Sequence, residues 1–253
     1  MTATAADHAG AAAIATAAGE LLLEVRASLE DANAHPRYVQ AAGDKVSHDF
    51  IMEALAEQFP DDAVLSEEGD DDSVRLDAER VWIVDPLDGT REFGERGRSD
   101  WAVHVALVVD GAVVAAAVAL PALGITFADE PPPPPSPPVG GRRPRMVVSR
   151  SRPPAMTGPL QAGLGADLVP LGSAGAKAMA VVVGEVDIYA HHGGQYEWDS
   201  AAPVGVAAAA GLHVSRLDGT PLEYNRPDPW LPDLLICKQE LVRPVLEIVN
   251  QYT

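Results

Sequence analysis

Two aspartates that flank a proline carry the strongest chemical signal in this sequence. Asp85 and Asp88 lie in the segment Asp85-Pro86-Leu87-Asp88, directly after the apolar run 81–84. The proline restricts the backbone, so both carboxylates can converge on one point, and the carbonyl of Leu87 can supply a further oxygen. Mg²⁺ takes hard oxygen ligands of this kind, together with waters and substrate phosphate oxygens. The segment therefore predicts a magnesium site at the end of a buried strand.

The next two residues suit a phosphate group. Gly89 permits a ligand to approach the backbone closely, and the N–H groups that follow it point toward an anion if a helix starts at Thr90. The alternative is an ordinary Asp-Gly turn with a capping threonine. Because the pair follows two aspartates at a strand end, we favour a phosphate cradle beside the metal site.

Two further acidic positions are candidates for the same cluster. Glu67 and Glu68 follow the short apolar run 63–65, and Glu197 and Asp199 flank a tryptophan. Strand ends are where the sites of α/β proteins assemble. A solvated charge is the simplest interpretation of Glu68 and Glu197, but the residues alone do not rank the members of either pair.

Three segments together resemble the signatures of the inositol monophosphatase superfamily. They are L-S-E-E at 65–68, W-I-V-D-P-L-D-G-T at 82–90 and W-D-S-A-A at 198–202, in the family's order. The resemblance extends over nearly the whole chain. It implies an α/β (α+β layered) fold, an alternating αβαβα sandwich of the inositol monophosphatase and fructose-1,6-bisphosphatase type. It also implies a Mg²⁺-dependent phosphomonoesterase.

The resemblance assigns the metal ligands residue by residue. Glu67, Asp85 and the Leu87 carbonyl resemble the ligands of a first Mg²⁺. Asp85, Asp88 and Asp199 resemble those of a second, so that Asp85 bridges the two ions. Two such ions can clamp the attacking and leaving oxygens of a displacement at phosphorus.

The resemblance also implies how the reaction runs. A water activated by the metal at Asp85 attacks the phosphorus in line, and Glu67 and Thr90 resemble the pair that orients and deprotonates it. The segment 44–49 departs from the family's D-x-V-T-x-x-D pattern. Asp44 is a candidate contact to a third ion and Ser47 a candidate helix cap, and both stay outside the core site.

The segment 172–177, G-S-A-G-A-K, resembles the bisphosphate nucleotidase branch of the superfamily. Residues 207–213 and 218–222 resemble its bacterial CysQ-type members. Lys177 either attracts a second phosphate or is a surface lysine. The expected substrate-binding residues are Asp88, Gly89, Thr90, Ser173, Lys177 and Asp199.

The reaction implied is removal of the 3′-phosphate of 3′-phosphoadenosine 5′-phosphate, which gives AMP and phosphate. Two alternatives stay open. One is a phosphatase for inositol 1-phosphate or fructose 1,6-bisphosphate with the same metal core. The other is a non-catalytic, regulatory phosphate-binding protein. The resemblance further implies inhibition by lithium and a homodimer.

Histidines and tryptophans are expected to have structural roles. The four histidines considered as metal ligands lack the helical H-x-x-x-H spacing of many zinc sites: His104, His191, His192 and His213. His191 and His192 could touch substrate at the rim of the site. Trp101 and Trp198 are expected to pack rather than to stack on a base.

Hydrophobic periodicity predicts the elements that position these residues. In the first half we expect a long helix over the first thirty residues, ended by the breakers Asn33 and Pro36, and a helix over 47–59. Strands are expected at 63–65, at 81–84 (where Pro86 must end it), and at 101–109, 112–120 and 125–127, with an Asp-Gly hairpin between 109 and 112. In the second half we expect strands at 146–148, 168–171, 187–190, 213–215 and near Cys237, and helices at 153–164, 174–183, 199–210 and 240–249.

A proline- and glycine-rich loop at 131–143 divides the chain, because it suits neither a helix interior nor a sheet ladder. We expect an N-terminal α+β half at 1–130 that carries most metal ligands. A C-terminal α/β half at 144–253 is expected to supply the substrate pocket and the last ligand. The two halves should form one compact catalytic unit.

Composition limits the partners. The 253 residues hold 18 Lys and Arg against 37 Asp and Glu, a formal net charge of −19, which argues against a nucleic acid polymer as partner. The single Cys237 excludes a disulfide framework. No secretory signal and no apolar stretch of about 18 residues is evident. A small phosphorylated metabolite, no membrane partner and a cytoplasmic location are therefore expected.

Overall fold

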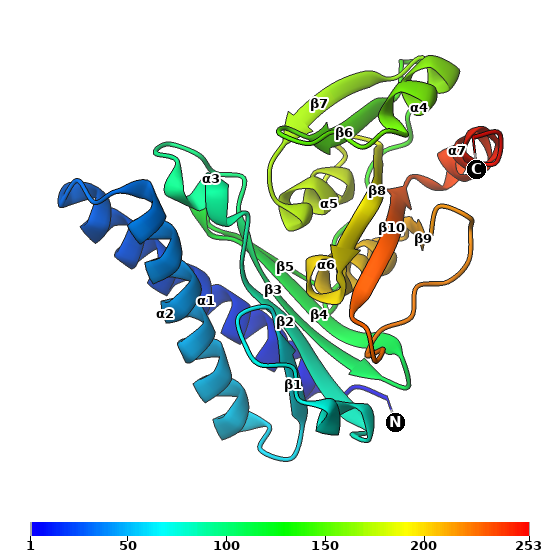
Figure 1. Cartoon of the computed structure of the whole chain (residues 1–253). Coiled ribbons are helices and arrows are strands. Elements are labelled where there is room, and N and C mark those ends of the chain that lie inside the picture. Colours follow the sequence, from blue (N-terminus) through cyan, green and yellow to red (C-terminus); the bar gives the residue numbers. More distant parts are fainter. Residues whose placement is uncertain (1, 253) are drawn as a thin grey trace.

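Five layers of helices and sheets make up the structure, a computed structural model that describes residues 2–252 (Figure 1). Helices α1 (Ala5–Asp31) and α2 (Pro36–Gln58) cover the outer face of a first sheet. Helices α5 (Ala174–Val182) and α6 (Glu197–Ala209) lie between this sheet and a second one. Helices α4 (Thr157–Leu164) and α7 (Val242–Val249) form the last layer. The predicted αβαβα sandwich is confirmed.

The first sheet has the strand order β1-β2-β3-β4-β5. Its strands are β1 (Ala63–Ser66), β2 (Arg80–Asp88), β3 (Ala102–Val109), β4 (Ala112–Leu120) and β5 (Ile125–Ala128). Only β1 and β2 are parallel, and the other neighbours are antiparallel. The predicted hairpin is confirmed: Asp110 and Gly111 both have positive φ, 50° and 76°, which matches the twist of the strands that they join.

Helix α2 corrects the sequence prediction at its start. It begins at Pro36 rather than near Ser47, because proline suits the first turn of a helix, where its missing N–H would have no helical partner. His35 caps the helix through its Nδ1, which accepts from the N–H of Arg37 at 3.2 Å. The residue predicted to break one helix therefore begins the next.

Ser47 and Pro86 differ from their predicted roles. Ser47 lies buried within α2 and donates to the carbonyl of Pro86 at 2.6 Å, so its predicted role as a helix cap is wrong. Strand β2 does not end at Pro86 but continues to Asp88, with a register irregularity between Asp85 and Asp88. Prolines are tolerated at such bulges, and this one redirects the two aspartates.

The second sheet has the order β7-β6-β8-β10-β9. Its strands are β6 (Arg145–Ser149), β7 (Asp167–Leu171), β8 (Ile188–Tyr196), β9 (His213–Ser215) and β10 (Trp230–Cys237). Strand β6 runs parallel to β7 and β8, whereas β10 is antiparallel to β8 and β9. Each predicted strand is present, although β8 extends to Tyr196, where α6 begins.

Small residues let α6 pack closely on the first sheet. Ala201, Ala202 and Ala207 are fully buried on this helix. A Cβ at Gly205 would lie 2.6 Å from the Cβ of Ala116 on β4, so only glycine fits there. The position of α6 relative to the sheet is therefore set by side chains of minimal size.

Shorter elements complete the fold. These are α3 (Thr90–Gly94) and the 3₁₀ helices η1 (Ser73–Leu76), η2 (Pro121–Leu123) and η3 (Gln239–Leu241). Residues 132–139 form neither helix nor strand, as predicted, and Val139 anchors this loop by donating its N–H to Glu240 at 2.9 Å. Helix α4 starts at Thr157 rather than 153, after two prolines. Among the described helices, none is long and apolar enough to cross a membrane.

Candidate active site

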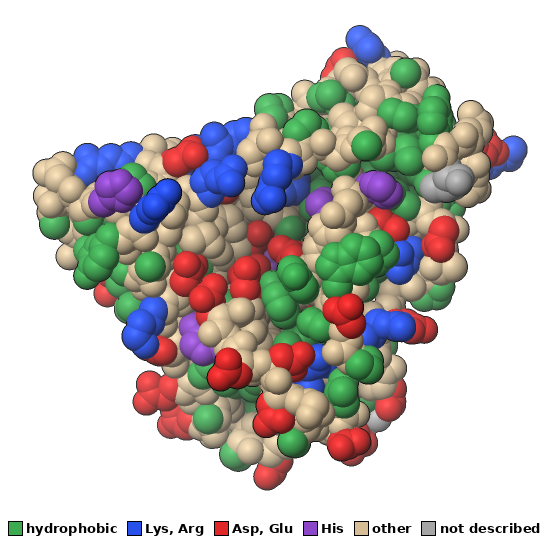
Figure 2. Space-filling view, viewed as in Figure 1, with side chains coloured by type: hydrophobic (Ala, Val, Ile, Leu, Met, Phe, Trp, Pro, Cys, Tyr) green, Lys and Arg blue, Asp and Glu red, His purple; other side chains and the backbone are tan. Residues whose placement is uncertain are grey.

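Three aspartates from two layers converge at the centre of the molecule. Asp85 and Asp88 lie at the end of β2, and Asp199 lies in the first turn of α6. One carboxylate oxygen of each lies within 4.8 Å of the others. Figure 2 shows acidic side chains gathered in a hollow, with Lys and Arg side chains along its upper edge. The bulge in β2 and the start of α6 therefore meet as the sequence predicted for these residues.

Burial makes this cluster electrostatically unfavourable without a counter-charge. Burial, with the charges of Glu67 and Asp88, raises the pKa of Asp85 well above its usual range. Burial and the charge of Asp88 raise the pKa of Asp199 to about 6. A bound cation would relieve this repulsion, and an all-carboxylate donor set suits a hard divalent ion. The residues present therefore fit a metal ion.

Glu67 lies at the edge of the cluster, just after β1. Its N–H donates to the carbonyl of Val84 at 3.3 Å, which ties it to the neighbouring strand. Burial and the charge of Asp199 raise the pKa of its carboxyl to about 7. Glu67 therefore acts electrostatically with the aspartates, although it is outside the group of three whose oxygens lie within 4.8 Å. Glu68 is exposed, as predicted.

Asp88 has an environment opposite to that of its neighbours. Its Oδ2 accepts hydrogen bonds from the Ser173 hydroxyl and from the N–H of Gly175, the latter at 2.7 Å, and lies 3.3 Å from Nε2 of His104. Burial would raise the pKa of Asp88, but the charges of His104 and Lys177 outweigh it and hold the pKa below its usual range.

His104 was not among the predicted site residues, and it was expected to have a structural role rather than to bind a metal. It is fully buried, and its Nδ1 lies 3.0 Å from the carbonyl of Trp198. Burial lowers its pKa, but the hydrogen bond and charge of Asp88 outweigh this and raise it. The signal lies in the antiparallel register of β2 and β3, in which His104 pairs directly with Asp85.

Thr90 has Asp44 as its polar partner. The Thr90 hydroxyl lies 3.3 Å from Oδ1 of Asp44 and 3.1 Å from the Leu87 carbonyl. Burial and the charge of Glu68 raise the pKa of Asp44 to about 6. The structure thus places Asp44 of α2 next to Thr90, which was predicted to act with Glu67.

Gly89 is required by its conformation and by its neighbours. Its φ is +85°, and a Cβ there would lie 3.1 Å from the Cβ of Ser173 and 3.2 Å from the carbonyl oxygen of Asp100. Helix α3 starts immediately after it, at Thr90. Neighbouring segments of the chain therefore approach Gly89 closely, and the close approach of a ligand at Gly89 stays a prediction.

A cavity of about 600 Å³ lies over the cluster. The predicted site residues that line it are Glu67, Asp88, Gly89, Thr90, Ser173, Lys177 and Asp199. Asp85 and Leu87 are buried beneath it. Arg91 and Arg152 also line the cavity, are exposed, and have no hydrogen bond or ion pair from their side chains to any residue that the structure describes.

Lys177 is buried, so its interpretation as a surface lysine is wrong. Its Nζ donates to the carbonyl of Ser173 at 2.8 Å and to that of Gly172 at 3.3 Å, and lies 5.2 Å from the centre of the Tyr189 ring. Burial lowers its pKa, against the opposing charge of Asp88. The ammonium therefore places a positive charge in the wall of the cavity and fixes the start of α5.

Ser173 has a strained backbone. As the N-cap of α5 it has φ 44° and ψ 131°, a region that residues with a side chain rarely adopt. Such strain costs roughly 1–3 kcal/mol and persists only where surrounding contacts enforce it. Its hydroxyl accepts from the N–H of Ala176 at 2.9 Å and donates to Asp88.

Glu197 corrects another prediction. It is fully buried rather than solvated, and its carboxylate accepts from the N–H groups of Asn225 at 2.6 Å and Arg226 at 2.9 Å. These bonds satisfy the charge and fix the loop before β10. Within the 197–199 segment, Glu197 therefore has the structural role, and Asp199 faces the site.

The tryptophans pack as predicted. Trp101 is fully buried, with its ring edge-on to Phe93 at a centroid distance of 5.0 Å. Trp198 stacks on Tyr196, with centroids 4.8 Å apart. His191 lines the cavity, and its Nε2 lies 2.8 Å from the carbonyl of Gly194.

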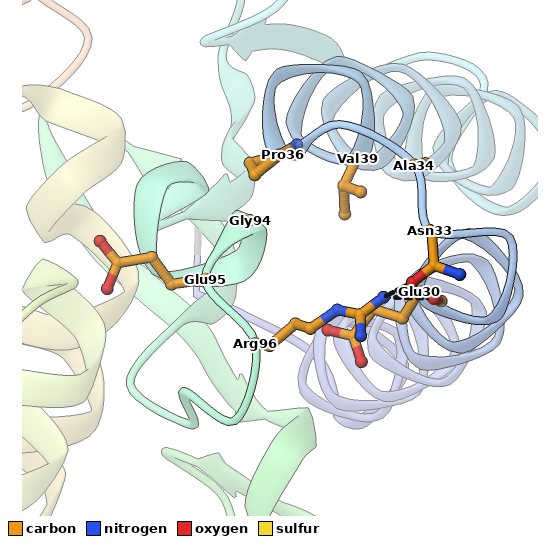
Figure 3. Close-up of a pocket in the computed structure, with 8 residues that line it drawn as sticks. All are labelled: Glu30, Asn33, Ala34, Pro36, Val39, Gly94, Glu95 and Arg96. Atoms are coloured by element: carbon orange, nitrogen blue, oxygen red, sulfur yellow. Dashed lines mark hydrogen bonds between the residues drawn. The ribbon is translucent and has the colours of Figure 1, made fainter.

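A second cavity, of about 460 Å³, lies between the end of α1, the start of α2 and the end of α3 (Figure 3). Arg96 crosses its edge and donates to Oδ1 of Asn33 at 3.2 Å and to the carbonyl of Glu30. None of the predicted site residues lines this cavity. The chemistry therefore belongs to the cavity over the aspartates.

The fold and this acidic site define a family. Residues 5–130 and 145–249 match the model of the inositol monophosphatase family, and the chain belongs to that family. The chain is also 49% identical over 256 residues to the 3′-phosphoadenosine 5′-phosphate phosphatase of Mycobacterium leprae, across 97% of this chain and 94% of the relative.

Solved structures show the same fold. CysQ from Bacteroides thetaiotaomicron, a bacterial member of the family, superposes with a TM-score of 0.74 at 27% identity, over 92% of this chain and 97% of that one. Inositol monophosphatase II from Staphylococcus aureus superposes with a TM-score of 0.77 at 22% identity, over 96% and 94%.

Proposed function

We propose that this protein is a Mg²⁺-dependent phosphatase that removes the 3′-phosphate of 3′-phosphoadenosine 5′-phosphate, giving AMP and phosphate. The observation that carries the proposal is the aspartate cluster, Asp85, Asp88 and Asp199, beneath a cavity with cationic side chains. The name and close similarity of the mycobacterial relative support the same activity. The family resemblance alone supports a cytoplasmic homodimer.

Five oxygen donors would hold two Mg²⁺ ions: Glu67, Asp85, the Leu87 carbonyl, Asp88 and Asp199. When bound, the ions supply an activated water and neutralise the charge of the phosphate. Asp85 is the most deeply buried carboxylate of the set, and by the family resemblance it would serve both ions. Asp44 is a candidate contact to a third.

Two side chains of the site can handle the proton of the attacking water. Thr90 presents a hydroxyl that Asp44 and the Leu87 carbonyl hold in place. Glu67 has a pKa of about 7 without bound cations, raised by burial and by Asp199. Bound cations would lower this pKa and keep Glu67 ionised, so that its carboxylate could accept a proton. By the family resemblance, Glu67 is the proposed general base and Thr90 orients the water.

The rest of the cavity favours a nucleotide with two phosphates. The unpaired guanidinium groups of Arg91 and Arg152 suit a second phosphate, which inositol 1-phosphate lacks. Tyr196 and Trp230 line the cavity, pair across β8 and β10, and remain 46% and 47% exposed. These rings offer an apolar surface to a base, which fructose 1,6-bisphosphate lacks.

Phosphate release tests the proposal. Purified protein should hydrolyse 3′-phosphoadenosine 5′-phosphate with Mg²⁺ and stop on addition of a chelator. Its kcat/KM should exceed those for inositol 1-phosphate and fructose 1,6-bisphosphate. A preference for either sugar phosphate would assign the alternative activity. Absence of metal-dependent release from all three would instead favour a non-catalytic phosphate-binding protein.

A further inference from the structure

Residues 172–175, at the start of α5, hold the metal-ligand candidate Asp88 by one oxygen. The Ser173 hydroxyl and the Gly175 N–H both donate to Oδ2 of Asp88, and His104 approaches the same atom. No hydrogen bond to Oδ1 is present within residues 2–252. These contacts therefore determine which carboxylate oxygen of Asp88 faces the start of α5 and which is left for a cation.

The backbone of Ser173 keeps its strained conformation because hydrogen bonds hold the chain on both sides of its Cα. On one side, Lys177 donates to the carbonyl of Ser173. On the other, the N–H of Gly172 donates to Oδ2 of Asp100 at 2.6 Å. Gly172 has no room for a side chain, since a Cβ there would lie 2.3 Å from Cδ of Glu92.

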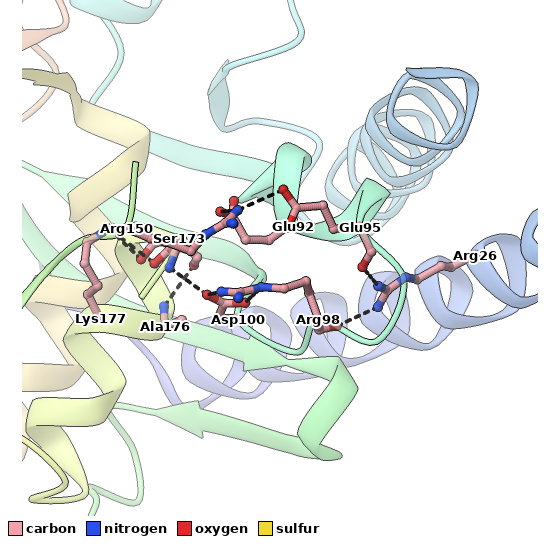
Figure 4. Close-up of polar contacts among 10 residues, drawn as sticks. Arg26, Glu92, Glu95, Arg98, Asp100, Arg150, Ser173, Ala176 and Lys177 are labelled. Atoms are coloured by element: carbon pink, nitrogen blue, oxygen red, sulfur yellow. Dashed lines mark hydrogen bonds and ion pairs between the residues drawn. The ribbon is translucent and has the colours of Figure 1, made fainter. Parts of the chain in front are cut away.

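Asp100 is itself fixed by a charged partner. Nε of Arg98 donates to Oδ1 of Asp100 at 2.8 Å, and the other end of the guanidinium donates to Oδ2. The backbone of this segment is anchored to α1, because Arg26 donates to the carbonyls of Glu95 at 2.6 Å and Arg98 at 2.8 Å. Figure 4 shows this series of contacts from Arg26 to Ser173.

We propose that Asp100, held by Arg98, is a positioning residue that acts through Ser173 to orient the metal ligand Asp88. The physical basis is that a bidentate Arg–Asp pair has a fixed geometry, so it can hold one N–H at a defined place. Groups that orient a metal ligand typically contribute 10- to 100-fold in metal affinity. The inference rests on the proposed metal-dependent function, and it assigns a role in that function to Asp100, which does not line the cavity.

Direct calorimetric titration of Mg²⁺ into the metal-free protein tests this inference through a double-mutant cycle. We expect Asp100→Asn to weaken Mg²⁺ binding by roughly 10-fold. In a Ser173→Ala background, where the hydroxyl to Asp88 is already lost, the same substitution should weaken it less than about 2-fold. Urea unfolding of each variant measures stability separately.

Asp233 supplies a matched control. It also accepts a bidentate pair from an arginine, Arg216, at 2.8 and 2.9 Å, and a backbone N–H, from Leu217 at 2.8 Å, yet it does not line the cavity. Asp233→Asn should leave Mg²⁺ affinity unchanged whatever its effect on stability. If Asp100→Asn fails to fold, Arg98→Gln carries the same comparison.

The outcomes separate the two proposals. Failure of the wild type to bind Mg²⁺ would reject the proposed metal site itself. Wild-type binding with an unchanged affinity in Asp100→Asn, or with an equal loss in both backgrounds, would overturn the positioning role of Asp100. A loss that disappears with Ser173→Ala supports it.

Discussion

The hydroxyl of Thr90 lies 3.3 Å from Oδ1 of Asp44, and this contact joins the start of α3 to the middle of α2 beside the aspartate cluster. Asp44 reaches this point although its surrounding sequence departs from the family pattern. The contact makes Asp44 part of the machinery that holds Thr90, since the hydroxyl can then present a defined side to a water.

Removal of the Thr90 hydroxyl should lower turnover. We expect Thr90→Ala to reduce kcat by about 100-fold, the lower end of what positioned proton-transfer groups contribute, with little change in KM. Thr90→Ser should retain activity within several-fold because it keeps the oxygen. Steady-state kinetics on the three proteins make the comparison, and equal activity of the alanine and serine variants would rule out a role for the hydroxyl.

Asp88→Asn should lower turnover strongly and leave the fold intact. The amide oxygen can still accept from Gly175 and Ser173, but the negative charge toward a cation is lost. We expect kcat/KM to fall by roughly three orders of magnitude, about 4 kcal/mol of transition-state stabilisation. Circular dichroism checks the fold, and near-normal kinetics would refute the assignment of Asp88 as a metal ligand.

The two unpaired arginines should recognise the second phosphate. Arg91→Gln and Arg152→Gln should each raise KM for 3′-phosphoadenosine 5′-phosphate by about 10-fold or more, as expected for loss of a charged hydrogen bond. Hydrolysis of 3′-AMP, which lacks the 5′-phosphate, should be unaffected and serves as the control. Equal losses on both substrates would show that the arginines do not read the second phosphate.

The stability of the metal-free protein should depend on pH through the cluster. Burial and Asp199 raise the pKa of Glu67 to about 7, and burial and Asp88 raise that of Asp199 to about 6. The unfolded chain titrates these groups near pH 4, so the folded state binds protons more tightly. Their contribution to stability is therefore full below about pH 4 and is lost as the pH rises to about 7.

Urea unfolding in the presence of a chelator measures this effect. The wild type and Asp199→Asn should differ little at about pH 4, and the variant should become relatively more stable toward pH 7 because it carries no charge at that position. Saturating Mg²⁺ should remove the advantage of the variant. A constant difference across the range would contradict the raised pKa of Asp199.

Ser47→Ala tests the link between α2 and the bulge of β2. The substitution removes the donor to the buried Pro86 carbonyl, which should cost about 1–3 kcal/mol in the free energy of unfolding. Ser47→Thr keeps the hydroxyl and is the comparison for side-chain size. A change below about 0.5 kcal/mol would show that the hydrogen bond contributes little.

Features carried by local sequence could be predicted well. Residue type is enough to predict the Asp-Gly hairpin, the apolar strands and the D-P-L-D-G-T segment, because turn conformations and strand burial depend on near neighbours. Asp85 and Asp88 are candidate ligands on these grounds, the family resemblance adds Asp199, and the structure brings the three together.

Features that depend on distant partners could not be predicted from the sequence. Glu197 is buried because the N–H groups of Asn225 and Arg226 satisfy it, and nothing in its own segment shows them. Ser47 finds its acceptor on another strand, and Asp100 finds Gly172 far along the chain. Pro36 was ambiguous on local grounds, since proline is found both beyond helix ends and at helix starts.

The division of the chain at the proline-rich loop and the assignment of each site residue to its role stay predictions. The structure places the aspartates of the first half against Asp199 of the second, with the cavity above both. The experiments on Thr90, Asp88 and the arginines address the roles one by one.

The close packing of α6 on β4 fixes the distance between the carboxylate of the helix and those of the sheet. Asp199 lies on α6, whereas Asp85 and Asp88 lie on β2 of the sheet. The close contact of Gly205 with Ala116 sets the distance between the helix and the sheet. One added methyl group at this contact would displace the helix from the sheet and increase the distance between Asp199 and the two aspartates of β2. The small residues between α6 and β4 therefore determine the distance between carboxylates with which they make no contact.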